Sequence, residues 1–392
     1  MKSLLVLLFI HSISCSFGDA EIDKVVRDHM KTAKLVGLGI GLVHDGKVVY
    51  LKGYGYENKK KKIKVDPRRT MFRWASISKT LTGTAAVRMF ELGLIDFHED
   101  IRTYYKNYKM PKKYYQGKGK QNLVAIPSTD NVMTLHHLLT HTAGIQHYGN
   151  GKSHPSPPRS WSKSPKTNKG VESALKFWAK NPLISLPGEE HHYTTVGYNL
   201  AGVVMLKASP YKKFGKLISE LVAKPAGLKT LRVDYQWRKI PRRAVGYVDA
   251  PVFGIIKGTN SDISWKQPGG GFISSVNDLA KYGAYHLENK FFENPETIKV
   301  LMTPKKLGNG KKIKYGYGFA SGGKMRAGHS GSQEKAKTKL SINFKNKLVL
   351  ALMSNTNHKK TALSALSKKI EKIMKTRLAE KKSVIILEKP IR

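Results

Sequence analysis

The chain has 392 residues, of which 40% are hydrophobic, and its 70 Lys and Arg residues against 27 Asp and Glu give a formal net charge of +43. This length is enough for two ordinary domains or one large two-lobed fold, and the apolar content excludes a wholly disordered chain. The charge favours anionic partners in general, a polyanion or an anionic surface included, but no RNA-binding pattern or zinc-finger spacing accompanies it, so we expect no specific nucleic-acid recognition. A solvated, lysine-rich surface is the simplest interpretation.

Residues 1–18 have the pattern of a secretory signal peptide. Lys2 precedes an apolar run from Leu4 to Ile10, which is too short to span a bilayer, and small residues follow through Gly18. We therefore expect a secreted protein that is not transmembrane. Cys15, the only cysteine, lies in this segment, so the mature chain would have neither a disulfide nor a cysteine metal site. A bacterial lipid anchor at Cys15 is the weaker alternative.

The first elements of the mature chain are a predicted hairpin and a predicted helix. Residues 35–56 favour a β-hairpin, because two β-rich runs flank Asp45-Gly46, a pair suited to positive φ. A helix is predicted from Ser76 to Leu92, with Gly93 as its C-cap. Residues 104–131 are polar and basic, and we expect them to form an exposed excursion.

Helices dominate the middle of the chain. They are predicted at 134–140, 171–180, 195–208 and 211–223. Residues 149–170, rich in Pro, Ser, Gly and Lys, are expected to be loop. After a glycine turn at 269–271, a further helix should begin near Val276, with Ser275 as its N-cap.

The last part of the chain favours strands and a closing helix. Apolar or alternating runs indicate an antiparallel strand set at 316–321, 325–330, 336–344 and 347–354. The closing helix is predicted at 361–378, with four apolar residues on one face, namely Leu363, Leu366, Ile370 and Ile373.

This order of elements predicts an α+β fold. An antiparallel sheet assembled from both chain ends would be flanked by helices, and an all-helical lobe would be inserted between its halves. We assign 19–75 and 265–392 to the α/β lobe and 76–264 to the mainly helical lobe. Catalytic groups are expected in the cleft where the lobes meet.

Ser76 and Lys79 are candidates for a nucleophile and its base. A serine in the first helical turn lies in the positive field of the helix N-terminus, and a lysine at i+3 projects beside it. If burial and nearby cations lower the lysine pKa from about 10.4, a neutral Lys79 could take the hydroxyl proton. The spacing alone is weak evidence, and a plain helix start is the alternative, because five other serines share it: Ser160, Ser173, Ser209, Ser321 and Ser332.

Several stretches carry a family resemblance. They are FRWASISKTLTG (72–83), ELGLID (91–96), TLHHLLTHTAGIQHY (134–148), LPGEEHHYTTVGYNLAG (186–202), KPAGLKT (224–230), PGGGFISSVNDLAKYG (268–283), YGYGF (315–319) and GHSGS (328–332). In this order they resemble the serine β-lactamase and penicillin-binding family, above all class C enzymes and the animal mitochondrial serine β-lactamase-like proteins. The resemblance implies a β-lactamase/transpeptidase-like fold and a serine hydrolase that acts through an acyl-enzyme on an amide, peptide or ester bond. A small-molecule or peptide substrate is expected, and no cofactor.

The resemblance also implies roles for individual residues. Ser76 would be the acylated nucleophile, Lys79 its base and Tyr193 a proton relay. The backbone N–H groups of Ser76 and Ser332 would form the oxyanion hole. Substrate would be bound by the remaining motif residues, Thr195, His329, Ser330 and Gly331.

Two positions depart from the family pattern. Thr195 stands where the Tyr-x-Asn motif has Asn, as in the mitochondrial relatives, and His329 replaces the usual lysine, so a substrate carboxylate would meet a titratable group. Both departures argue against an efficient antibiotic-degrading enzyme and leave hydrolysis of an ester, amide or peptide open. A non-catalytic scaffold or polyanion-binding protein that keeps the fold is the alternative.

His136, His137 and His141 raise the possibility of a metal site. No acidic residue lies between His137 and His141 as in H-E-x-x-H, and no carboxylate ligand follows nearby. The resemblance assigns this helix to the structural scaffold, so we expect no metal.

Overall fold

A computed structural model describes residues 19–117, 121–148, 170–250, 252–258, 261–323, 325–357 and 363–387. The predicted signal peptide and nearly all of the predicted loop at 149–170 lie outside these residues. In the described part of the chain, no helix is long and apolar enough to cross a membrane.

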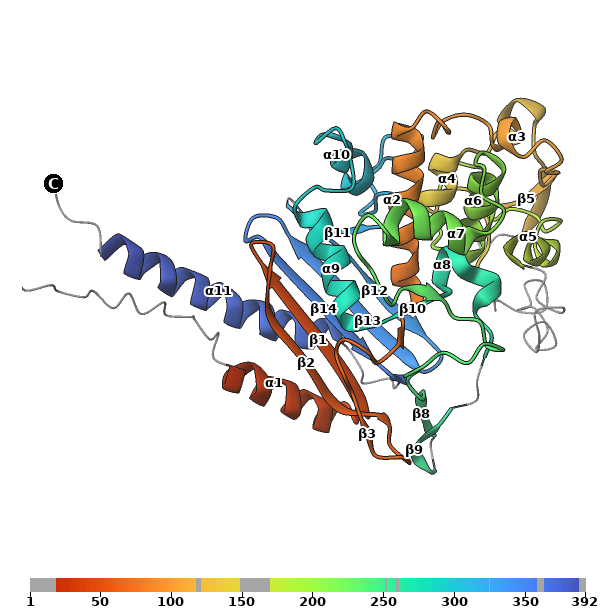
Figure 1. Ribbon diagram of the computed structural model, residues 1–392. Coiled ribbons are helices and arrows are strands. Elements are labelled where there is room, and N and C mark those ends of the chain that lie inside the picture. Colours follow the sequence, from red (N-terminus) through yellow and green to blue (C-terminus); the bar gives the residue numbers. More distant parts are fainter. Residues whose placement is uncertain are drawn as a thin grey trace, which may run out of the picture.

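A seven-stranded sheet joins the two ends of the chain, in the order β11-β12-β13-β14-β1-β2-β3 (Figure 1). Its strands are β1 (Gly37–His44), β2 (Lys47–Asn58), β3 (Ile63–Lys64), β11 (Ala320–Ser321), β12 (Arg326–Gln333), β13 (Ala336–Asn343) and β14 (Leu348–Ser354). All neighbours are antiparallel, and β1 pairs with β14 from Leu38 opposite Ser354 to His44 opposite Leu348. The predicted sheet from both chain ends is therefore confirmed.

The β1–β2 hairpin shows how the sequence produces this sheet. Asp45 and Gly46 have φ values of +48° and +75°, the left-handed conformation that the predicted turn requires. Both faces of β1 are covered. Leu38 and Ile40 pack with α1 (Asp19–Thr32) and α11 (Leu363–Leu387) on one face. Gly39, on the other face, lets Val276 of α9 (Val276–Leu287) approach closely, because a β-carbon there would lie 2.9 Å from that side chain.

The helical part of the molecule lies beside the sheet and surrounds α2 (Ser78–Glu91) (Figure 1). A 3₁₀ turn, η1 (Ala75–Ile77), precedes α2, so Ser76 lies in this turn and Lys79 in the first turn of the α-helix. Gly93 follows the helix with a φ of +69°, in agreement with the predicted C-cap. Elements that contact α2 include α6 (Thr195–Lys207), α7 (Phe214–Ile218), η5 (Ser219–Ala223), α8 (Gln267–Gly270) and α10 (Thr297–Met302). α4 (Leu135–Leu139) packs against α6.

The helices predicted at 134–140, at 195–208 and after Ser275 are confirmed. Ser275 accepts a hydrogen bond from the Asp278 amide, as an N-cap does. The helices predicted at 171–180 and 211–223 are interrupted: α5 (Gly170–Ala174) continues as η4 (Leu175–Phe177), and α7 continues as the π-turn η5. The closing helix predicted at 361–378 is α11, which runs on to Leu387. The predicted glycine turn is instead the end of α8.

One expectation holds only in part. Most of the described residues in 104–131 are exposed, as expected, but the segment contains the hairpin of β5 (Lys113–Gln116) and β6 (Asn122–Ala125) and buries Met110, Tyr114 and Ile126 in the main core. Their basic composition reflects only the outer face of this segment.

Several short elements were not predicted. They are α3 (Ile101–Tyr104), α10 (Thr297–Met302), η2 (Ser128–Asp130), η6 (Ser264–Lys266), β4 (Phe72–Arg73), β7 (Arg232–Val233), β8 (Tyr247–Ala250), β9 (Gly254–Lys257), β10 (Phe272–Ser274) and β15 (Thr356–Asn357), together with the N-terminal α1. Three of them form the small sheet β4-β10-β7, which holds the strand leading into η1. The predicted lobe boundaries remain a prediction.

Candidate active site

A cleft of ≈470 Å³ lies where η1 and α6 meet the sheet edge at β12. Its lining residues are Ser76, His147, Tyr148, Tyr193, Thr195, Tyr315, Ala320, His329, Ser330 and Ser332. The cleft therefore brings together six of the predicted site residues, which are separated by up to 256 positions in the sequence. The other two, Lys79 and Gly331, are buried in its walls.

Lys79 lies buried in the wall of the cleft, next to Ser76. Its side chain is fully buried, and Nζ donates to Thr195 Oγ1 at 3.0 Å and to the carbonyl oxygen of Gly269 at 2.8 Å, while it lies 3.3 Å from Ser76 Oγ. These three oxygens belong to α6, α8 and η1, so three elements fix the lysine against the serine hydroxyl.

The surroundings of Lys79 favour its neutral form. Burial lowers its pKa well below the usual value, and the positive charge of Lys266 lowers it further. The hydrogen-bond acceptors around Nζ are uncharged oxygens, which stabilise an ammonium less than a carboxylate would. A neutral amine beside a serine hydroxyl is able to accept its proton.

Tyr193 lies at the mouth of the cleft, just before α6, and is 40% exposed. Burial of its hydroxyl raises the pKa, while its interaction with the Ser76 side chain lowers it. Lys79 Nζ lies 4.8 Å from the centre of the Tyr193 ring. Ser76, Lys79 and Tyr193 therefore form one connected group.

Two histidines hold the residues at the start of α6, and sequence reasoning gave neither of them this role. The Thr194 amide donates to His141 Nδ1 at 3.1 Å, and the Thr195 amide donates to His147 Nδ1 at 3.0 Å. Both rings therefore carry their proton on Nε2 when neutral. Burial lowers both pKa values, that of His147 to about 4. The sequence signal was present in the stretch THTAGIQHY, but it does not show which backbone groups these rings would meet.

The histidines considered for a metal site have separate structural partners. His136 Nδ1 lies 2.9 Å from the Tyr317 hydroxyl, and His137 forms a capping box with Thr134. Across the described ranges, no group of three or more His, Cys, Asp and Glu side chains is arranged to hold a metal ion.

His329 lines the cleft as a neutral ring. Its Nδ1 donates to the Ser330 carbonyl oxygen at 2.6 Å, which leaves Nε2 to accept from the Tyr315 hydroxyl at 2.8 Å. Burial lowers the His329 pKa to about 3. A substrate would therefore meet an uncharged ring at the position where the family pattern has a lysine.

The edge of β12 forms the opposite wall. β11 pairs with Gly328 and Ala327, and among the described residues no strand pairs with the edge at Ser330 and Ser332, which faces η1. Ser332 and Ser76 both line the cleft. The oxyanion hole of their two backbone N–H groups remains a prediction.

Lysines surround the rim of the cleft. Lys337 Nζ donates to Ser332 Oγ at 2.7 Å, and Lys339 Nζ donates to Ser330 Oγ at 3.3 Å. On the helical side, Lys266 Nζ donates to the Tyr148 hydroxyl at 2.7 Å. No acidic side chain lines the cleft within the described residues.

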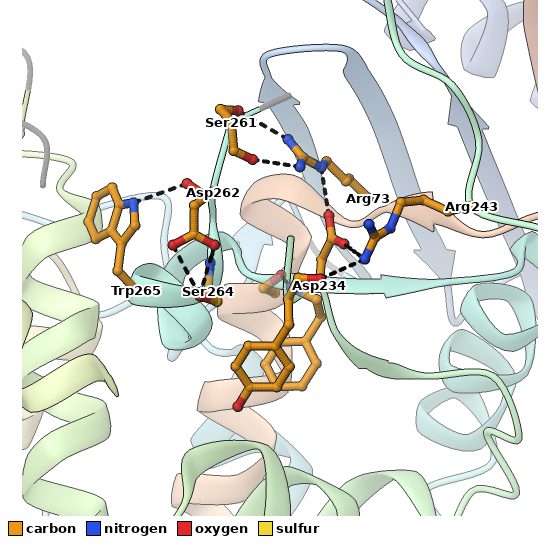
Figure 2. A network of polar contacts seen from close by, with 10 residues as sticks. Arg73, Asp234, Arg243, Ser261, Asp262, Ser264 and Trp265 are labelled. Carbon is orange, nitrogen blue, oxygen red and sulfur yellow. Dashed lines mark hydrogen bonds and ion pairs between the residues drawn. The ribbon is translucent and has the colours of Figure 1, made fainter. Parts of the chain in front are cut away.

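A buried ion-pair network holds the segment that carries Lys266 (Figure 2). Asp234 accepts from Arg73 Nε at 2.8 Å and forms an ion pair with Arg243 at 2.9 Å. The Arg73 guanidinium also donates to the Ser261 carbonyl oxygen at 2.8 Å. The network thus ties β4, three residues before Ser76, to the chain that leads into η6 and α8.

Comparisons of the amino-acid sequence relate this chain to one protein family. A family model described as Beta-lactamase matches residues 22–372. Protein flp of Staphylococcus aureus (strain N315) is 23% identical over 352 residues, which cover 86% of this chain and 63% of that protein. The mitochondrial serine beta-lactamase-like protein LACTB of Bos taurus is 25% identical over 342 residues, covering 68% of this chain and 59% of that protein. This chain therefore spans less than two thirds of the length of these curated relatives.

Solved structures share the fold. The octameric penicillin-binding protein homologue from Pyrococcus abyssi has a TM-score of 0.66 at 24% identity, with 86% of this chain and 73% of that chain covered. The D-amino acid amidase from Ochrobactrum anthropi SV3 has a TM-score of 0.72 at 19% identity, with 92% and 99% covered. Similarity at these identities is evidence for the fold, and it confirms the predicted α+β architecture.

Proposed function

Because the chain belongs to the beta-lactamase family, we propose that it is a serine hydrolase that cleaves an amide, peptide or ester bond through an acyl-enzyme on Ser76. The observation that carries this proposal is the fully buried Lys79, whose Nζ lies 3.3 Å from Ser76 Oγ and whose pKa is lowered. A merely structural lysine would be expected to reach solvent or a carboxylate.

In the acylation step, Lys79 Nζ takes the hydroxyl proton as Ser76 Oγ attacks the substrate carbonyl carbon. The negative charge that develops on the carbonyl oxygen would be stabilised by the backbone N–H groups of Ser76 and Ser332, a contribution of about 3 kcal/mol per donor in serine hydrolases. Tyr193 would pass a proton to the leaving group as its bond to the carbonyl carbon breaks, and Lys79 would return the proton to Tyr193.

Deacylation reverses these roles. A water molecule loses a proton to the Lys79–Tyr193 pair and attacks the ester carbon, after which Ser76 Oγ leaves and is reprotonated. The neutral His329, in place of a fixed cation, supports substrates other than carboxylate-bearing antibiotics. We further propose that the predicted signal peptide directs this activity outside the cell.

Labelling with a fluorophosphonate probe and with a fluorescent penicillin tests the proposal. We expect at least one probe to label the wild type, with the adduct on the peptide that contains Ser76, and no labelling of Ser76→Ala. Ser209→Ala is the matched control, because Ser209 has the same spacing to a lysine but lies outside the cleft, and it should label like the wild type. If neither probe labels the wild type above Ser76→Ala, the proposal of a hydrolase acting through Ser76 fails.

A further inference from the structure

The tip of the β8–β9 hairpin exposes large apolar side chains. Val252 is 86% exposed and Phe253 is 79% exposed, directly before β9, and Ile256 within β9 is 40% exposed. β8 and β9 pair from Tyr247 opposite Lys257 to Ala250 opposite Gly254, so the apolar pair lies at the far end of a projecting ribbon. Single exposed apolar residues are common on proteins, but adjacent ones at a projecting tip are typical of an interaction site.

Exposed lysines surround the base of this hairpin. The β2–β3 turn consists of Lys59, Lys60, Lys61 and Lys62, all exposed. The Lys59 amide donates to the Tyr247 hydroxyl at 2.7 Å, which fixes the turn to the hairpin. Figure 1 shows β3 and the β8–β9 hairpin at the same end of the molecule. Lys257, at the end of β9, is exposed as well.

Acidic residues also lie near this base, but the exposed lysines outnumber them. Glu334 is exposed beside Lys335, whose side chain lies near Gly258. Glu57, beside the lysine turn, is buried and paired with Arg242 at 2.9 Å. Asp249 is the only acidic residue from Tyr247 to Lys257, and it is partly buried. The end of the molecule therefore combines an apolar tip with a cationic base.

We propose that this end of the molecule is a membrane-docking site for anionic lipid bilayers. Val252 and Phe253 enter the interface between headgroups and acyl chains, and the lysines of the β2–β3 turn contact the anionic headgroups. Aromatic side chains favour this interface, and each lysine near an anionic surface adds to the attraction. A soluble polyanion would use the same lysines but would gain nothing from the apolar tip, so the tip favours the bilayer.

Co-sedimentation with vesicles tests the proposal. We expect the wild type to bind vesicles of phosphatidylcholine and phosphatidylserine in equal amounts, and to bind pure phosphatidylcholine vesicles much more weakly. The double variant Val252→Ser, Phe253→Ser should need roughly tenfold more lipid for half-maximal binding, because it loses the apolar area that enters the bilayer. Replacement of the four turn lysines by Gln should weaken binding by a similar factor and reduce its dependence on salt.

Leu123→Ser is the matched control, because Leu123 is an apolar residue on another short hairpin strand, β6, and is 46% exposed. It should bind vesicles like the wild type. The proposal is overturned if the tip variant binds as well as the wild type, if Leu123→Ser loses as much binding, or if the wild type binds heparin but not the anionic vesicles. The last result would identify the lysines as a polyanion site.

Discussion

Gly331 of β12 lies directly against the backbone of Trp74. A β-carbon at Gly331 would be 2.6 Å from the Trp74 carbonyl oxygen and 2.0 Å from Thr338 Oγ1. The Thr338 hydroxyl donates to the same Trp74 oxygen at 2.9 Å. The sheet edge therefore meets the segment that carries Ser76 without a side chain in between, and this contact places Ser332 and Ser76 on the same cleft.

Gly331→Ala should consequently damage the site. The added methyl group forces β12 and η1 apart, so we expect the free energy of unfolding to fall by about 1–3 kcal/mol and labelling of Ser76 to slow more than the lost stability explains. Urea unfolding and labelling rates on the folded protein measure the two effects. Gly308→Ala is the control, because its β-carbon would meet only the Gly188 carbonyl oxygen, at 3.7 Å. Wild-type labelling by Gly331→Ala would contradict this account of the cleft.

The sequence predicted those parts of the fold that rest on local signals. The turn at Asp45-Gly46, the last three late strands and the capped helix after Ser275 depend on residues close together in the chain, and the structure confirms them. The strand predicted at 316–321 is reduced to the two residues of β11. For residues 104–131 the expected exposure holds for most described positions, but the charged outer face concealed a few buried residues such as Tyr114. The helix α1 was missed because its apolar stripe is narrow: Ile22 and Val26 are buried against the sheet, and Val25 and Met30 are partly buried beside them.

The candidate site was harder to predict from local sequence patterns than the fold. The pair of Ser76 and Lys79 can be found from its spacing, but Lys79 also contacts Thr195 and Gly269, which are 116 and 190 positions away. Only the family resemblance suggested Thr195, and nothing pointed to the support that His147 gives it.

Lys266→Gln should shift the pH dependence of labelling. The positive charge of Lys266 contributes to the lowered pKa of Lys79, after the larger effect of burial. Without this charge the Lys79 pKa rises, so the pH of half-maximal labelling rate should move up by roughly one unit or less. Tyr148→Phe removes the same Lys266–Tyr148 hydrogen bond but keeps the charge, so its midpoint should not move. A downward shift in Lys266→Gln would show that Lys266 does not act on Lys79 in this way.

Asp234→Asn should destabilise the protein strongly. The Asp234 side chain is 1% exposed and that of Arg73 is 9% exposed, so the substitution leaves two arginines facing a neutral amide in a buried site (Figure 2). Loss of one partner of such an ion pair costs about 3 kcal/mol or more, which urea unfolding would measure. Asp45→Asn serves as the control: its ion pair with Lys347 is exposed, with 63% and 66% of the two side chains accessible, and stability should barely change. Similar results for both variants would mean that the network in Figure 2 does not hold the site together.

Buried neutral histidines should make the protein sensitive to mild acid. Burial lowers the pKa of His136, His286 and His329 to about 3 and the pKa of His137 and His147 to about 4, from 6.5. Below pH 6.5 the unfolded chain therefore binds more protons than the folded protein, so the free energy of unfolding is retained above this pH and falls as the pH drops toward these values.

Each such histidine can contribute at most about 1.4 kcal/mol per pH unit, and urea unfolding between pH 7 and pH 5 would measure the combined slope. His286→Gln should make this slope shallower by the contribution of one histidine, because it removes one titrating ring. The Gln amide can still bond Thr84, which lies 3.0 Å from His286 Nε2, so the variant should fold. If the free energy of unfolding stays constant or rises from pH 7 to pH 5, these rings are protonated in the folded protein. The neutral state assigned to His329 would then be wrong.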